Sequence, residues 1–462
     1  MRASAPALAL LFPALAQAHG FGTRYELPLP LAIYLTSAAL TILLSFLAMA
    51  WFSRRAVSAG EGWSFDMLTT LPGRLLASAP VLFVLRLAAV ALFVLVVAAG
   101  LLGTQSPLKN IAPAFVWALW WVGMTYLSAL AGDLWALLNP LETIFRWAEA
   151  AHARARPGRR LSLDLPYPQA AGVWPAAALF LVFVWMELVW EGADRPASVS
   201  LAIIAYAALA WTGMLLFGRR EWLRRGEVFA IVFGLIARFS PTQAREVDGR
   251  WQWKLRPYAV GLLAREPAGA SEVALIAFML AAVTFDGLRE TPLWAAASLG
   301  DVAGLLGTAL LMLAAYLLVC KAMVPLGENL QTWRRTAGLF IFTLIPIAIA
   351  YHLAHYLSFL GAALQYMIPL ASDPFGRGWD LFGGATHFVR PGIVDAKTVW
   401  YVAVPAIVAG HMLAVWLAHL LALREFPGRR AALRSQYPMV ALMIAYTMTS
   451  LWIIAQPIVT ER

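Results

Sequence analysis

The stretch PVLFVLRLAAVALFVLVVAAGLLG, residues 80–103, holds one charged residue, Arg86. A helix of this length crosses the hydrocarbon core of a bilayer, which is about 30 Å thick. Similar apolar runs recur along the chain and are separated by short polar segments. This pattern predicts an all-α protein, a polytopic transmembrane helix bundle, and argues against a soluble protein with one large core.

The apolar runs predict about ten spans. We expect them near residues 29–52, 80–103, 112–136, 173–191, 199–217, 272–289, 302–324, 337–360, 399–423 and 437–456. Two further segments, 132–145 and 227–239, are apolar but too short to cross, so we interpret them as re-entrant or interfacial helices.

Composition supports a membrane protein. The chain is 61% hydrophobic and 13% charged, whereas soluble domains carry about a quarter charged residues. The net charge of +10 comes from arginines clustered between the apolar runs, which indicates cytoplasmic loops and predicts no nucleic-acid partner. The single cysteine, Cys320, excludes an intrachain disulfide.

The first 18 residues have the pattern of a cleaved signal peptide. Arg2 precedes a short apolar core that ends in Ala-Gln-Ala, so cleavage makes His19 the mature amino terminus. Residues 19–462 then form a single integral membrane domain. The mature amino terminus and a long loop, 361–398, are expected outside, with the basic loops inside. This predicts a multi-pass protein of the bacterial inner membrane.

Five histidines are expected in the outer half of the membrane or above it. His352 and His355 share one face of a span, and His411 lies at comparable depth in the next one. His387 lies in the outer loop, and a free amino-terminal His19 could chelate copper with its amine and ring. We predict a metal site formed by these residues, for which copper fits better than zinc or iron.

Carboxylates near the outer ends of the spans supply candidate bases. Glu187 and Asp286 lie within predicted spans, where ionisable residues are costly and often functional. Glu191, Asp373 and Asp380 are expected to be solvated. Soluble-enzyme signatures such as G-x-S-x-G, HExxH and the Walker loop are missing from the sequence.

Several segments together resemble a known family. They are HGFGTRYELPLPL, FDGLRETPLW, YHLAHYLSFL, QYMIPLASDPFGRGWDLFG, TVWYVAVPAIVAGHMLAVWLAH and RSQYPMVALMIAYT. The chain from His19 onward is similar to bacterial membrane proteins labelled fenitrothion hydrolase. The resemblance implies hydrolysis of an aryl phosphorothioate triester with release of a nitrophenol, and it supplies no catalytic residues.

The leading hypothesis is therefore a membrane-embedded, metal-dependent enzyme whose site opens to the periplasmic face. One alternative is a copper-dependent oxidase or oxygenase with His19 as a ligand. Others are a transporter of metal or small molecules, in which His419 extends the path, and an electron-transfer protein with haem b between His352 and His411. Expected partners are the lipid bilayer and a small hydrophobic substrate, with a second membrane or periplasmic subunit as a further candidate.

Overall fold

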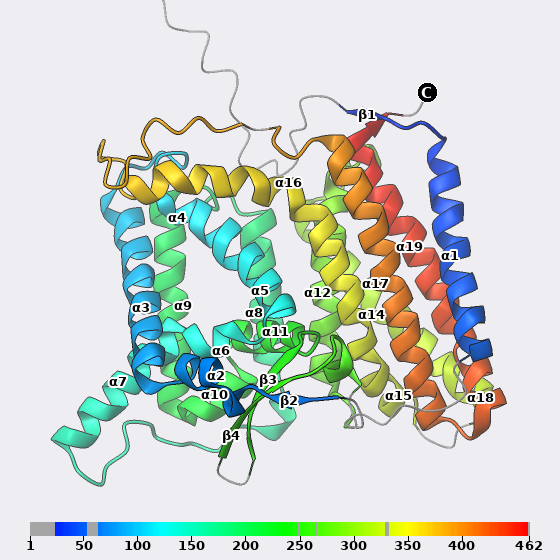
Figure 1. Ribbon diagram of the computed structural model, residues 1–462, viewed down its shortest axis with the longest axis horizontal. Coiled ribbons are helices and arrows are strands. Elements are labelled where there is room, and N and C mark those ends of the chain that lie inside the picture. Colours follow the sequence, from blue (N-terminus) through cyan, green and yellow to red (C-terminus); the bar gives the residue numbers. More distant parts are fainter. Residues whose placement is uncertain are drawn as a thin grey trace, which may run out of the picture.

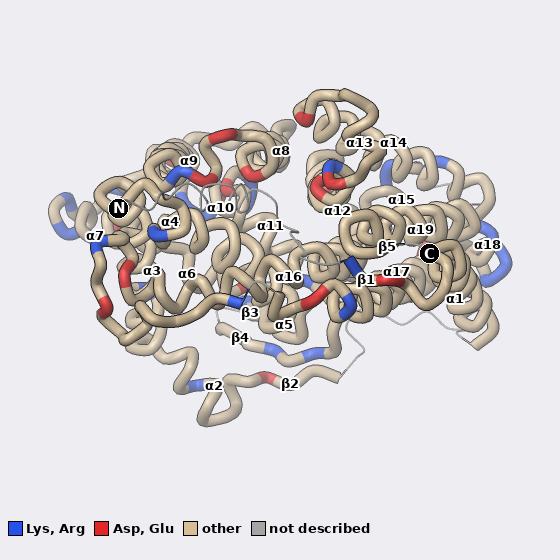
Figure 2. The backbone as a smooth tube through the Cα atoms, turned by 90° about the horizontal axis from the view of Figure 1, so that it is seen from above, with Lys and Arg blue, Asp and Glu red and all other residues tan. Residues whose placement is uncertain are grey.

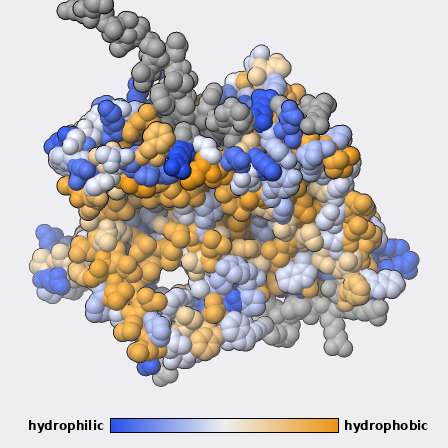
Figure 3. All heavy atoms as spheres, turned by 45° about the horizontal axis from the view of Figure 1, so that its top comes forward, coloured by the Kyte–Doolittle hydropathy of each residue, from blue (hydrophilic) through white to orange (hydrophobic). Residues whose placement is uncertain are grey.

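The computed structural model describes residues 24–52, 63–247, 250–263, 266–328, 332–390 and 392–460. Within these ranges ten helical segments are long and apolar enough to cross a membrane, as the sequence predicts. The chain is an all-α, multi-pass membrane protein. Apolar side chains form a broad belt between two hydrophilic ends (Figure 3).

The ten spans follow one another along the chain. Five are single helices: α1 (Leu31–Phe52), α3 (Ala79–Leu102), α9 (Pro196–Phe217), α12 (Ala270–Arg289) and α14 (Asp301–Leu326). A sixth single helix is α17 (Ala396–Glu425). The other four are composite: α4 (Ile111–Ala114), η2 (Phe115–Gly123) and α5 (Met124–Leu130); η3 (Gln169–Ala171) and α8 (Trp174–Leu188); α15 (Trp333–Phe340), η5 (Ile341–Leu344) and α16 (Ile345–Ser372); and α18 (Gly428–Ser435) and α19 (Tyr437–Ile458).

The remaining elements are short. They are helices α2 (Leu71–Leu76), α6 (Leu134–Leu138), α7 (Pro140–Ala155), α10 (Arg219–Arg225), α11 (Val228–Ala237) and α13 (Pro292–Ala297), and strands β1 (Tyr25–Glu26), β2 (Phe65–Asp66), β3 (Thr242–Val247), β4 (Arg250–Leu255) and β5 (Val459–Thr460).

Both ends of the described chain lie on one face. Strand β1 pairs in parallel with β5, beside the loop 373–395, and we call this the loop face (Figure 1). Ten crossings return the chain to the face where it began, so the β1–β5 pairing agrees with an even number of spans. Helix α11 has 10 residues and, as predicted, is too short to cross.

The arginine-rich segments gather on the opposite face. Helices α7, α10 and α18 and the hairpin β3–β4 lie there, and we call it the basic face (Figure 1). Lys and Arg residues colour the outlying α7 and α18 at the two ends of the molecule (Figure 2). The spans thus separate the basic segments from the loop 373–395, as the charge pattern predicts.

The spans form two groups. Helices α3, α9, α8 and the α4–η2–α5 segment make one, and α1, α12, α14, α16, α17 and α19 make the other (Figure 1). Contacts of α8 with α12 and of η2 with α16 join them. The carboxyl-terminal part of α16 runs along the loop face, where Tyr366 and Leu370 pack against Ala99 and Ile111 of the first group (Figure 1).

Two boundaries differ from the predicted ones. Helix α16 continues to Ser372, so the connection to α17 begins later than the predicted loop 361–398. The segment GAALQYMIPLAS is largely apolar and continues the helix. It packs against the loop-face ends of α3 and α4 and does not form a solvent-exposed loop. The third span ends at Leu130, because Gly132 adopts a positive φ of 135° that breaks the helix before α6.

Candidate functional site

The site is built around the end of α12. This helix begins with a cap in which the Glu272 carboxylate accepts from the Gly269 backbone N–H at 2.8 Å, and it is buried from Val273 to Gly287. Asp286 lies one turn before its end and is 4% exposed. A buried carboxylate in a membrane span requires hydrogen-bond partners, and α16 and α8 supply them.

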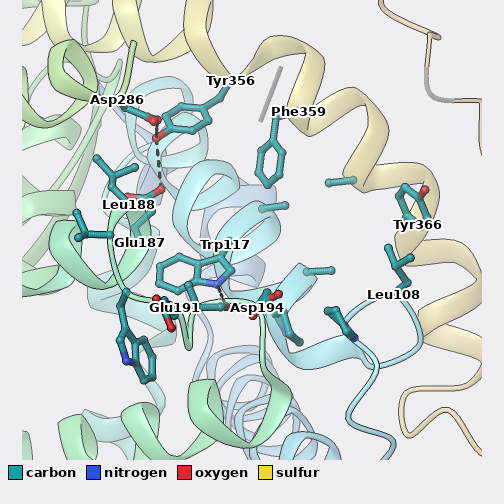
Figure 4. Close-up of a pocket in the computed structure, with 18 of the residues that line it drawn as sticks. Leu108, Trp117, Glu187, Leu188, Glu191, Asp194, Asp286, Tyr356, Phe359 and Tyr366 are labelled. Atoms are coloured by element: carbon teal, nitrogen blue, oxygen red, sulfur yellow. Dashed lines mark hydrogen bonds between the residues drawn. The ribbon is translucent and has the colours of Figure 1, made fainter. Parts of the chain in front are cut away.

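Asp286 lies between two side chains of α16. His355 Nε2 is 2.7 Å from Asp286 Oδ2, and the Tyr356 hydroxyl donates to the same oxygen at 2.8 Å. Tyr356 also lies 3.3 Å from Oε1 of Glu187 on α8 (Figure 4). One phenol therefore bridges two carboxylates that come from different groups of spans.

The backbone next to Asp286 permits this approach. A Cβ atom on Gly287 would lie 3.0 Å from the Tyr351 hydroxyl, 3.7 Å from His355 Nδ1 and 2.7 Å from Ile453 Cγ2. The missing side chain lets α16 pack closely against α12, and this closeness brings His355 within hydrogen-bonding distance of Asp286.

Arg289 supplies a positive charge. It follows Asp286 by three residues on α12, and its Nη2 lies 4.0 Å from Asp286 Oδ1 and 3.9 Å from Glu290 Oε1. Its Nη1 donates to the carbonyl of Leu188, the last residue of α8. Arg289 thereby ties the end of α8 to α12 and holds its guanidinium beside the carboxylates.

A cavity of about 310 Å³ opens at this cluster. Its wall includes Glu187, Asp286, Arg289 and Tyr356, and also Glu191 and Asp194 from the α8–α9 connection (Figure 4). His355 does not line the cavity, so it stands behind Asp286 as a partner of the carboxylate. Phe359 and Tyr366 of α16 complete the wall towards the loop face.

The opposite wall comes from an unusual helix. Residues Phe115–Gly123 form a π-helix, η2, inside the third span, and such segments occur frequently at functional sites. Trp117 of η2 lines the cavity, and its Nε1 donates to the Ala193 carbonyl at 2.7 Å. Trp121 lies deeper and contacts His352 edge-on at 6.2 Å between ring centroids.

His352 lies beside the same network. It is 7% exposed, and neither ring nitrogen has a hydrogen-bond partner among the described residues. Its ring packs 4.6 Å from that of Tyr356. It lines a small cavity of about 40 Å³ together with Glu187, Tyr356 and Trp121, adjoining the larger one.

His411 and His419 lie elsewhere in the bundle. Nδ1 of His411 donates to the Ile407 carbonyl at 2.8 Å, and its ring packs 5.7 Å from that of Tyr446. His411 lines neither cavity. His419 Nδ1 lies 3.2 Å from the Gln436 side-chain oxygen, near α18.

The loop 373–395 uses its carboxylates to shape turns. Asp373 accepts from the backbone N–H groups of Arg377, Gly378 and Trp379. Asp380 accepts from the Ala385 N–H and the Ser372 hydroxyl, and these bonds hold its pKa below the usual value. His387 is exposed on this loop.

The predicted metal ligands are therefore not gathered. Within the ranges that the structure describes, no group of three or more His, Cys, Asp or Glu side chains is placed to hold a metal ion. Of the predicted ligands that lie within the described residues, only His352 and His355 adjoin the Glu187–Asp286 cluster. His19 and the signal sequence 1–18 lie outside the described residues, so the metal site stays a prediction.

Sequence reasoning missed Tyr356, Arg289 and the tryptophans of η2. Tyr356 directly follows His355, and Arg289 follows Asp286 at a spacing of three, which places it near the same helix face. Both were visible as polar residues at span ends. The π-helix has no comparable signal, because its sequence FVWALWWVG is compatible with any buried helix.

Comparison with known proteins adds no assignment. No family model matches the chain, and neither does any curated protein or any solved structure. The function must therefore be argued from the site.

Proposed function

We propose that the protein is a membrane-embedded hydrolase that cleaves a hydrophobic phosphotriester in the cavity beside Asp286 and Glu187. The observation that carries this proposal is the Tyr356 hydroxyl, which contacts both carboxylates on the wall of a 310 Å³ cavity. Two carboxyl groups facing one cavity can divide the roles of general base and general acid. The sequence resemblance to fenitrothion hydrolases agrees with this reaction class.

In the proposed reaction Asp286 acts as the base. It accepts hydrogen bonds from His355 and Tyr356 and lies near Arg289, and these contacts hold its carboxylate at the wall of the cavity. Asp286 takes a proton from a water molecule as the water oxygen attacks phosphorus. The bond between phosphorus and the aryl oxygen breaks, and Glu187 gives its proton to the departing phenol oxygen.

The other residues position these groups. Arg289 stabilises the negative charge that develops on the phosphoryl oxygen or sulfur. The Tyr356 hydroxyl holds the carboxylates of Asp286 and Glu187 close to each other. His355 does not line the cavity, and it fixes the orientation of the Asp286 carboxylate. The products are a dialkyl phosphate or phosphorothioate and a phenol, so one water molecule is consumed per ester.

The metal-dependent form of this reaction, expected from the sequence, stays a prediction. His355 and Asp286 are hydrogen-bonded to each other, and His411 donates a hydrogen bond to the Ile407 carbonyl of its own helix. No step above is therefore assigned to a metal. The predicted orientation, with the loop face in the periplasm, places the cavity in the outer half of the membrane, where the substrate can enter from the outer leaflet.

The test is turnover by purified protein in lipid nanodiscs with a dialkyl nitrophenyl phosphate. Asp286→Asn and Glu187→Gln are expected to lower kcat by about 10²- to 10⁴-fold, the usual contribution of general acid–base catalysis. Glu221→Gln is the control, because Glu221 makes ion pairs with Arg224 and Arg225 on the basic face. Full turnover in both cavity variants would contradict the proposal.

A further inference from the structure

A second cavity, of about 450 Å³, lies beside the proposed site. It is lined mainly by α3, η2, α8 and α9, and its lining is almost entirely apolar and aromatic. Leu85, Leu92 and Val96 contribute one face of α3, and Ala202 and Ile203 contribute a face of α9. Its position within four spans places it at the level of the hydrocarbon core.

The carboxylate of Glu227, which precedes the lining residue Val228, is not part of the cavity lining. Glu227 is 1% exposed and caps α11 by accepting from the backbone N–H groups of Phe229 and Ala230 at 3.2 and 2.6 Å. The Tyr206 hydroxyl and Trp135 Nε1 also donate to it. Tyr206 and Trp135 therefore present their ring carbons to the cavity, while their polar atoms are satisfied behind it.

The two cavities adjoin each other. Trp117 and Trp190 line both the polar cavity at Asp286 and the apolar one. The hydrogen bond from Trp117 to Ala193 fixes the first of these rings at the boundary. A molecule that spans the boundary would place a polar group beside Asp286 and an apolar part between α3 and α9.

The apolar cavity is also open at its side. Leu85, Leu92 and Val182 line it and remain 40%, 37% and 50% exposed. A hollow surrounded by apolar side chains is visible in the half of the molecule that holds α3 and α9 (Figure 3). An opening in the apolar belt admits hydrocarbon chains and offers no partner for a polar ligand.

We infer that the apolar cavity binds a hydrocarbon chain of the substrate itself, so that the substrate class is an amphiphilic phosphoester with an alkyl or acyl chain. The inference rests on the proposed function and names the substrate of the same site. The phosphoryl group lies at Asp286 and Glu187, and the chain passes the Trp117–Trp190 boundary into the space between α3 and α9. Affinity for the chain comes from packing, because the chain is already in an apolar solvent before it binds.

The test compares two nitrophenyl phosphotriesters, one with methyl and one with octyl groups, at equal concentration in the bilayer. Ala202→Trp fills the cavity from α9, and Ala205→Trp is the matched control on an exposed part of the same helix outside the lining. Ala202→Trp is expected to lower kcat/KM for the octyl ester about tenfold, because the indole occupies the space that the octyl chain needs. The value of kcat/KM for the methyl ester should stay unchanged, because this ester has no chain that reaches the cavity. Retained methyl-ester turnover shows that the variant is folded.

An equal effect of Ala202→Trp on both esters, or none on either, would overturn the inference. A second measurement does not depend on turnover: an octyl phosphate with a terminal diazirine is photolysed in nanodiscs, and the adducts are mapped by mass spectrometry. Adducts on α3 and α9 that disappear in Ala202→Trp support the inference, and adducts confined to lipid-facing surfaces contradict it. If the unchanged protein hydrolyses neither ester, the proposed function fails, and the adducts still decide where the chain binds.

Discussion

His355 Nε2 lies 2.7 Å from the carboxylate of Asp286, and of these two residues it is Asp286 that lines the cavity. The histidine is therefore placed to orient a carboxylate, and the carboxylate is placed to meet a substrate. In this arrangement a carboxylate contacts the substrate and the histidine acts through it, whereas in a histidine cluster the imidazoles bind the ligand directly. The arrangement also makes two histidines of the predicted metal site, His355 and His411, experimentally distinguishable.

Removing the Tyr356 hydroxyl should lower both the stability of the fold and the rate of turnover. Tyr356→Phe leaves the carboxylates of Asp286 and Glu187 without their shared donor, which costs about 1–3 kcal/mol for a buried polar group. We expect a lower unfolding temperature in detergent and a lower kcat. Both are measured on the same preparation.

The control is Tyr351→Phe, one turn earlier on α16. The Tyr351 hydroxyl is buried and has no hydrogen-bond partner in the part of the chain that the structure describes. Its removal leaves no buried group without a partner, so stability should be unchanged or slightly higher. Equal losses in the two variants would show that the phenol of Tyr356 has no special role.

The histidines give a second prediction. His355→Gln should lower kcat, because Asp286 loses the group that orients it, whereas His411→Gln should keep kcat within a few-fold of the unchanged protein. Copper, zinc and iron are measured in both variants by elemental analysis, with His419→Gln as the control. A parallel loss of one metal and of turnover in both variants would instead support the predicted three-histidine metal site.

The spans could be predicted because each is a long apolar run bounded by arginines or by Gly and Pro. The pairing of Asp286 with His355 could not, because 69 residues and one intervening span separate them. Comparable depth in consecutive spans was the ground for predicting that His352, His355 and His411 lie together, but depth does not fix the direction in which a side chain points. The ring of His411 packs against that of Tyr446, and its Nδ1 donates to the Ile407 carbonyl.

Close packing at Gly287 gives a third prediction. Gly287→Ala introduces a methyl group 2.7 Å from Ile453 Cγ2 of α19 and 3.0 Å from the Tyr351 hydroxyl of α16, so these neighbours must shift away from α12. We expect a loss of about 1–3 kcal/mol in stability together with lower turnover. Gly307→Ala on α14, where nothing lies within 4 Å, should be neutral or stabilising. Comparable losses at both positions would contradict the packing argument.

The proposed orientation can be tested by labelling. Cysteine is placed at Asp380 on the loop face or at Arg159 near α7, in a protein whose buried Cys320 is replaced by serine. A membrane-impermeant maleimide added to intact spheroplasts should label position 380 and leave position 159 unlabelled. Labelling at 159 alone would place the cavity in the cytoplasmic half and would reverse the route of substrate entry.

The most direct test of the hydrolytic site is the origin of the oxygen added to phosphorus. Purified protein in nanodiscs is given a dialkyl nitrophenyl phosphate in heavy-oxygen water, and the phosphorus product is analysed by mass spectrometry. The proposed reaction predicts one heavy oxygen on phosphorus per turnover, and loss of this product in Asp286→Asn. Release of the phenol with oxygen taken from dioxygen, or an undiminished labelled product in Asp286→Asn, would contradict the account.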